Sequence, residues 1–146
     1  MTLRLDAFLP YRLSVASNAV SARISASYRK RFGLKIAEWR LIAILAEANE
    51  MTPQALGSAA RIDKISVSRA AAALIERGLI VARNNPEDGR SHLLALTEDG
   101  LSLYAEIAPM ALAMEAELLS RFTADERRQF DRLLRRIEGA AGADST

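Results

Sequence analysis

The sequence predicts a mainly α-helical fold that carries one small β-hairpin. Residues Pro86 to Arg90 contain the Pro, Asp and Gly needed to reverse a strand, and Leu94 and Leu96 follow at the spacing of one strand face. A helix that begins at Asp63 and closes at Gly78-Leu79-Ile80 precedes this hairpin. A helix followed by a hairpin with an arginine at its tip is suited to gripping duplex DNA, and it predicts a winged helix-turn-helix.

Length and composition are those of one folded domain, residues 1–146. Of the 146 residues, 50% are hydrophobic and 26% are charged, so a buried core is expected and a second, catalytic domain does not fit. The sequence has no cysteine, which excludes disulfides and thiolate metal sites. It also has no run of 18 apolar residues and no signal-peptide core. We therefore expect a cytoplasmic protein without a membrane span.

Charge is distributed unevenly along the chain. The net charge is only +2, but residues 1–40 hold eight Lys or Arg against two acids, and residues 41–146 hold twelve against sixteen. The cluster Arg29-Lys30-Arg31 can complement the negative end of the first helix, or basic residues of this region can meet an anion. The first interpretation is favoured for the cluster, because a charge run is usually a solvated face.

The other elements are predicted from caps and apolar spacing. Residues 37–48 are apolar all round, which predicts a helix in the core. Pro109 is expected to kink the helix that contains it. The predicted helices cover residues 8–31, ended by Gly33; 37–48; 52–60, with Thr52 as N-cap and Pro53 next; a stretch from Thr97 through Leu119; and a last helix from a capping box at Thr123 to Gly139, followed by a frayed tail.

The helix after Asp63 has two different faces. The face expected to point inward carries Val67, Ala70, Ala71 and Leu74. The opposite face carries Ile65, Ser68, Arg69, Ala72 and Glu76. Short polar side chains and one arginine between alanines can approach a DNA groove closely, although the same pattern also fits an ordinary amphipathic surface helix.

Several motifs occur together in a specific order. They are Asp63-Lys64, Val67-Ser68-Arg69, Leu74, Arg77-Gly78-Leu79, Asp88-Gly89-Arg90-Ser91 and Leu94-Ala95-Leu96-Thr97-Glu98-Asp99-Gly100, preceded by Glu38-Trp39-Arg40. With these motifs the chain resembles, over nearly its whole length, the MarR family of bacterial transcriptional regulators. The resemblance implies a homodimer that binds a palindromic operator, usually as a repressor, and releases DNA when a small molecule binds. It also implies a winged-helix lobe over 35–100 and helical dimerisation regions over 1–34 and 101–146.

The resemblance assigns roles to individual residues. Ser66, Ser68 and Arg69 would lie in the major groove, with Lys64 near the DNA backbone. Arg90 would reach the minor groove from the hairpin tip, where an arginine reads groove shape. Asp88 would orient Arg90 or pair with another basic group of the lobe.

Two positions depart from the family pattern. Arg61 stands where the family often has Gly, so a positive φ there would cost about 1 kcal/mol, although an arginine could gain a phosphate contact. Lys35 replaces a commoner Ser or Thr before the second helix, which weakens that N-cap by about 1 kcal/mol. Neither departure threatens the predicted fold.

The effector is predicted less sharply. A stripe of small polar residues on the first helix includes Ser21, and the basic residues Arg12, Arg23 and Arg40 and the aromatic Trp39 lie nearby in sequence or on the next helix. Such residues could bind an aromatic carboxylate or its thioester, with arginine as the anion partner and tryptophan as a stacking wall. Close packing of two helices explains the stripe equally simply, and Trp39 is more often a core residue.

Two other classes of protein fit the sequence less well. An enzyme is disfavoured because His92, the only histidine, has no acid partner nearby in sequence and no Gly-rich phosphate loop occurs. We accordingly expect no catalytic residue, metal or cofactor. The alternative function is a winged-helix module that binds only protein and is indifferent to duplex DNA.

Overall fold

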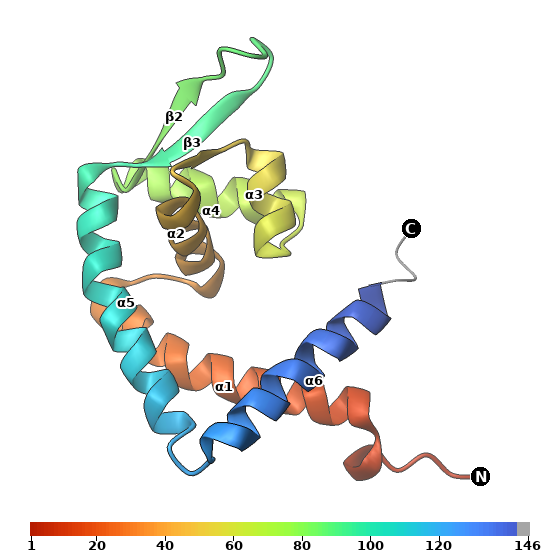
Figure 1. Ribbon diagram of the computed structural model, residues 1–146. Helices are drawn as coiled ribbons and strands as arrows, with labels where there is room; N and C mark the ends of the chain where they lie inside the picture. The colour runs from red at the N-terminus through yellow and green to blue at the C-terminus, as the bar shows by residue number, and fades with distance from the viewer. Residues whose placement is uncertain (143–146) are drawn as a thin grey trace. The chain divides into compact units, whose positions relative to one another are not determined.

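The structure, a computed structural model, describes residues 1–142 of the chain. Its elements in order are the 3-10 helix η1 (Leu5–Ala7), α1 (Leu9–Phe32), α2 (Ile36–Ala48), β1 (Glu50–Met51), α3 (Pro53–Ala60), α4 (Lys64–Glu76), β2 (Ile80–Asn84), β3 (His92–Leu96), α5 (Glu98–Leu118) and α6 (Ala124–Gly142) (Figure 1). The predicted fold class, mainly α with a small sheet, is confirmed. The chain forms two compact units, Met1–Pro109 and Met110–Thr146. Among the described residues, no helix is long and apolar enough to cross a bilayer.

The hydrophobic core lies in the winged-helix part of the first unit. Helices α2, α3 and α4 pack on one another, and α2 also packs on β3. Among the described residues, every buried apolar side chain except Tyr28 and Ile107 lies between residues 34 and 96. The prediction that α2 belongs in the core is confirmed, since Leu41, Ile42 and Leu45 are buried. This core supports α4, whose predicted inward face is buried as well.

The sheet has one more strand than the sequence predicts. Its order is β1-β3-β2, all antiparallel, and β1 pairs with β3 at Glu50 and Ala95. Strand β3 is therefore central. Its residues Leu94, Ala95 and Leu96 are all buried, so the expected alternation of one apolar face was wrong for this strand. The reason is that β1 and the helices cover positions that a bare two-stranded hairpin would leave in water.

Helix ends follow the predicted chemistry. Gly33 has φ 66°, a left-handed conformation that ends α1. The Thr52 hydroxyl accepts a bond from the Ala55 amide at 3.1 Å. Arg61 does adopt a positive φ, 54°, at the turn between α3 and α4. At Lys35 the backbone amide donates to Oε1 of Glu38 at 2.9 Å, so a glutamate side chain closes the first turn of α2 without a Ser or Thr cap.

The two C-terminal helices follow the prediction except at the C-terminal end of α6. Pro109 lies inside α5, which continues to Leu118. The capping box before α6 is confirmed, since the Thr123 amide donates to Glu126 at 2.9 Å and the Glu126 amide donates to Thr123 at 3.1 Å. Helix α6 runs to Gly142 and not to Gly139, because Ala140 and Ala141 are strong helix formers. The predicted frayed tail is therefore wrong for 140–142, and 143–146 lie outside the described residues.

Candidate nucleic-acid interface

Helix α4 begins at a well-formed N-cap. The Asp63 carboxylate accepts the Ser66 amide through Oδ1 and the Ser66 hydroxyl through Oδ2, each at 2.8 Å. The bond from the Ser66 amide, supported by the bond from its hydroxyl, lowers the pKa of Asp63 from its usual value. The first turn of α4 is thus held by an ionised carboxylate next to the positive end of the helix.

The residues predicted to read DNA lie on the exposed side of α4. Lys64, Ser68 and Arg69 are exposed. Ser66 is half-buried, and its hydroxyl proton is used in the cap, which leaves only its lone pairs for another partner. The opposite residues Val67 and Leu74 are fully packed, with 2% and 0% of their surfaces exposed. The polar side of α4 is therefore the side that is available to a partner.

The C-terminal end of α4 is tied to two other helices. The Arg77 guanidinium donates to the carbonyl of Phe32, the last residue of α1, at 2.8 Å. The Thr97 hydroxyl donates to the Gly78 carbonyl at 2.6 Å and accepts the Gly100 amide at the start of α5 at 3.1 Å. These bonds fix the direction in which α4 presents its polar side.

The hairpin tip, residues 85–91, is shaped by its own side chains. The Asn85 amide group donates to the Ser91 hydroxyl at 2.9 Å, which closes the base of the loop. Asp88 accepts the backbone amide of Arg90 at 3.0 Å. Asp88 therefore positions the backbone of Arg90. The Arg90 side chain is exposed.

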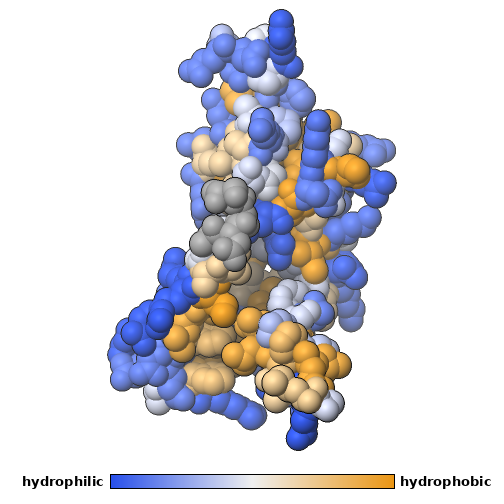
Figure 2. Space-filling view, turned by 90° about the vertical axis from the view of Figure 1, so that its right-hand side faces the viewer, coloured by the Kyte–Doolittle hydropathy of each residue, from blue (hydrophilic) through white to orange (hydrophobic). Residues whose placement is uncertain are grey.

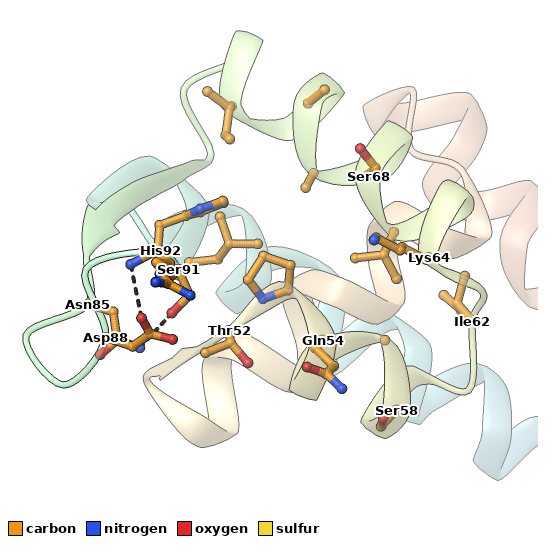
Figure 3. A pocket seen from close by; sticks show the side chains of 18 of the residues that line it. Thr52, Gln54, Ser58, Ile62, Lys64, Ser68, Asn85, Asp88, Ser91 and His92 are labelled. Atoms are coloured by element: carbon orange, nitrogen blue, oxygen red, sulfur yellow. Dashed lines mark hydrogen bonds between the residues drawn. The ribbon is translucent and has the colours of Figure 1, made fainter.

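A groove with a volume of about 1320 Å³ lies between α3, α4 and the hairpin. Lys64 and Ser68 line it from α4, and Asp88 lines it from the hairpin (Figure 3). Arg90 lines it from the hairpin as well. The charged groups that line the groove are Arg61, Lys64 and Arg90 with a single carboxylate, that of Asp88. The groove is therefore positive, as a surface that receives a polyanion needs to be.

Sequence reasoning missed several groove residues. Thr52 and Gln54 line it from the start of α3, Ser91 lines it from the hairpin tip, and His92 lines it from the start of β3 (Figure 3). Gln54 carried no signal beyond its place in the first turn of a helix. For His92, the position beside the predicted hairpin tip was the signal that could have found it.

The predicted ligand residues are only partly brought together. Trp39 and Arg40 line a smaller pocket of about 370 Å³ between α2 and the end of α3, and Arg61 lines it too. Arg12, Ser21 and Arg23 do not line it. Arg12 instead donates to the Asp6 carbonyl at 3.2 Å near the start of α1.

The pocket wall continues into an aromatic stack. The Trp39 ring lies 5.9 Å from the ring of Tyr28 and 5.9 Å from that of Tyr104, and it is parallel to the second within 18°. Tyr28 is buried, which raises its pKa, while the nearby charges of Arg40 and Arg29 act in the opposite direction. Trp39 is half-buried, so it belongs both to the core and to the pocket wall.

The arrangement of these elements defines a class of protein. Two short helices joined by a tight turn, followed by a hairpin that carries an arginine at its tip, form a winged helix-turn-helix, and a positive groove lies between its parts.

Comparison with known proteins places the chain within that class. The model of the MarR family matches residues 32–91. The HTH-type transcriptional regulator YwoH of Bacillus subtilis is 32% identical over 104 residues, which is 71% of this chain and 75% of that protein. The homoprotocatechuate degradative operon repressor of Escherichia coli is 28% identical over 72% of this chain and 71% of its own length. The chain belongs to the MarR family, whose members are transcriptional regulators.

Solved structures agree with this assignment. A MarR/EmrR family regulator from Acinetobacter sp. ADP1 is 28% identical, with a TM-score of 0.88 over 97% of this chain and 99% of that one. A mutant of MarR from E. coli, solved with operator DNA, shares the fold with a TM-score of 0.82 at 22% identity, over 94% of this chain and 99% of that one.

Proposed function

We propose that this transcriptional regulator binds a palindromic operator in double-stranded DNA as a homodimer, and that it represses transcription until a small effector releases it. The observation that carries the proposal is the positive groove between the polar side of α4 and the hairpin with Arg90. Helix α4 would enter the major groove, and the hairpin would enter the adjacent minor groove. The operator-bound E. coli structure of the same fold and the E. coli operon repressor support this assignment by similarity. The function requires no catalytic group, metal or cofactor, and it would be exercised in the cytoplasm.

Within this proposal each predicted DNA contact keeps its role. Ser66, Ser68 and Arg69 would read base edges, Lys64 would contact a phosphate, and Arg90 would occupy the minor groove. The role proposed for Asp88 is narrower than expected from sequence: it holds the Arg90 backbone, so that the guanidinium projects from a fixed point.

The operator can be identified by selecting bound duplexes from a random DNA library. Affinity for the selected duplex is then measured by fluorescence anisotropy at two salt concentrations. Arg69→Ala should weaken binding by roughly 1 to 3 kcal/mol per half-site, because a bidentate base contact is worth that much. Arg90→Ala should weaken binding and flatten the salt dependence. Arg121→Ala removes an exposed arginine outside the groove and is the matched control. A protein that enriches no sequence, and whose weak DNA binding ignores Arg90, would instead be a protein-interaction module.

Exposed apolar side chains support the homodimer. In the N-terminal half of α1, Leu9 and Leu13 are 68% and 41% exposed, and in α6 Phe130 and Leu133 are 57% and 50% exposed. Figure 2 shows hydrophobic surface exposed among hydrophilic residues on the face that it presents. Such surface is normally covered by a partner. Sedimentation should give a dimer at micromolar concentration, and a monomer there would contradict the two-half-site mechanism.

The proposed effector is a small aromatic acid or its thioester, bound at the pocket of Trp39 and Arg40. Among the described residues, neither Arg40 nor Arg61 has a carboxylate partner, so both guanidinium groups can accept an anion. The ligand-binding roles assigned to Arg12, Ser21 and Arg23 are supported only by the helix faces on which these residues lie. Titration with benzoate should change the fluorescence of Trp39, the only tryptophan, in the wild type and much less in Arg40→Ala. Benzoate that leaves both the fluorescence and operator binding unchanged would remove this ligand class.

A further inference from the structure

We infer that the groove holds the sugar-phosphate strand that separates the two DNA grooves, and that His92 binds a phosphate of that strand. Because the imidazole binds the phosphate in its protonated, positively charged form, operator binding is coupled to proton uptake. The inference rests on the DNA binding proposed above. It adds a strand-binding surface and a proton linkage that the recognition-helix and hairpin contacts do not supply.

The first step concerns the shape of DNA. A major groove and the minor groove beside it are separated by one backbone strand. A protein that places α4 in one and the hairpin in the other must therefore receive that strand between them. The groove of about 1320 Å³ occupies this position, since Ser68 lines it from α4 and Arg90 lines it from the hairpin.

The second step concerns the lining of the groove on the hairpin side. Ser91 is the last residue of the hairpin tip, and His92, the first residue of β3, pairs across the hairpin with Asn84 (Figure 3). Gln54, at the start of α3, lines the same groove. Hydroxyl and amide side chains are among the groups that bond phosphate oxygens, and an imidazolium can do the same. The side of the groove away from the reading face of α4 thus carries groups that can bond the DNA backbone.

The third step concerns charge. His92 is exposed, and the charged groups that line the groove with it are Lys64 from α4, Arg61 from the turn between α3 and α4, and Asp88 and Arg90 from the hairpin. Without DNA, the three cations outnumber the single carboxylate. A bound phosphodiester reverses the local field and favours the imidazolium. DNA binding should therefore take up a proton at each half-site.

Histidine is the side chain that ordinarily changes charge between pH 5 and 8, and His92 is the only histidine in the chain. A proton uptake in that range can therefore be assigned without ambiguity among side chains. The α-amino group is present in every variant and cancels in the comparison.

The test measures affinity for the selected operator by anisotropy between pH 5.5 and 8.0 at constant ionic strength, and repeats the salt titration at both ends. The wild type should bind on the order of tenfold more tightly at pH 5.5, with a salt slope steeper by about 0.9 for each additional phosphate that the protein neutralises. His92→Gln keeps a hydrogen-bonding side chain without the charge, and its affinity should not change with pH. His92→Arg should bind tightly at every pH.

The outcomes separate the inference from the proposed function. An operator that the wild type binds equally well at every pH would overturn the role of His92 and leave DNA binding intact. A pH dependence of affinity that persists in His92→Gln would also overturn the role of His92. If the selection enriches no duplex, both the proposed function and this inference fail. Because His92 is exposed, His92→Gln should unfold at the wild-type temperature, which excludes misfolding as the cause of a lost pH effect.

Discussion

Helices α4 and α6 have similar amphipathic patterns, but the exposed face is polar in α4 and includes apolar residues in α6. In α4 the apolar residues Val67, Ala70, Ala71 and Leu74 are buried by the rest of the winged helix, which leaves the polar side free. In α6, by contrast, the described residues include no buried side chain, and the apolar residues Phe130, Leu133 and Ile137 are exposed. A helix whose apolar side is satisfied within its own chain meets a polar partner, and one whose apolar side is not satisfied meets an apolar one. The same spacing of apolar residues thus leaves a polar face free on α4 and an apolar face free on α6.

The largest expected effect is on the stability of the winged-helix core. Leu74→Ala removes a side chain with 0% exposure and should lower the free energy of unfolding by about 2 to 5 kcal/mol, measured by urea denaturation. Leu133→Ala on α6 is the matched change at a side chain that is 50% exposed. It should change the stability of a single chain by about 0.5 kcal/mol or less and weaken self-association instead. Equal losses of unfolding free energy in the two variants would contradict the contrast between a buried apolar face on α4 and an exposed one on α6.

Two glycines give the next effect, with opposite signs. A Cβ at Gly100 would lie 2.1 Å from the Leu79 carbonyl oxygen, a backbone atom that cannot move aside cheaply, so Gly100→Ala should destabilise the protein by about 1 to 3 kcal/mol. At Gly139 in α6 a Cβ meets nothing within 4 Å, and Gly139→Ala should stabilise the helix by roughly 0.5 to 1 kcal/mol. Thermal unfolding of both variants measures the two shifts. A stable Gly100→Ala protein would show that the start of α5 is not clamped to the end of α4.

The smallest effect concerns the caps of the two helices. Asp63→Ala should destabilise α4 by about 1 kcal/mol, and Asp63→Asn should retain most of that stability because an amide oxygen still accepts the Ser66 amide. The folded-state pKa of Asp63 is lowered, so the contribution of its charge is complete above the usual carboxyl pKa and is lost as the pH falls through the lowered value.

The corresponding cap of α6 uses Glu126, whose pKa the Thr123 amide also lowers. Unfolding curves measured between pH 3 and 7 should therefore show that Asp63→Asn and Glu126→Gln each lack the pH-dependent stability that the replaced carboxylate contributes. If neither variant differs from the wild type in the pH dependence of its stability, the two carboxylates do not act as charged caps.

Local chemistry made much of the fold predictable. Helix starts at Thr52, Asp63 and Thr123 depend on side chains that bond amides three residues away, so their signals are contained in short stretches of sequence. The same holds for the stop at Gly33. The predicted end of α6 at Gly139 was wrong because a glycine stops a helix only where the following residues do not continue it.

Within the candidate interface, the predictable and unpredictable residues divide in the same way. Lys64, Ser68 and Arg90 could be named because motifs in the chain carry them, and each lines the groove. Gln54 could not be assigned to that groove, because its approach depends on the packing of α3 against α4, and the one signal for His92 was its position beside the hairpin tip. The aromatic stack of Tyr28, Trp39 and Tyr104 is also built from three helices, and spacing within any one helix does not contain it.

The sequence by itself determined the fold class, most helix boundaries and the arginine at the hairpin tip, because caps, apolar periodicity and turn residues act over a few positions of the chain. The family followed from the resemblance of its motifs. Only the tertiary structure decided that Glu50 and Met51 form a strand, that β3 is central and buried, and that His92 shares a groove with Lys64. These features arise when segments distant in sequence are brought together by burial of a common core. The hydrophobic effect that drives such burial is non-directional, so no short pattern records which partners it will select.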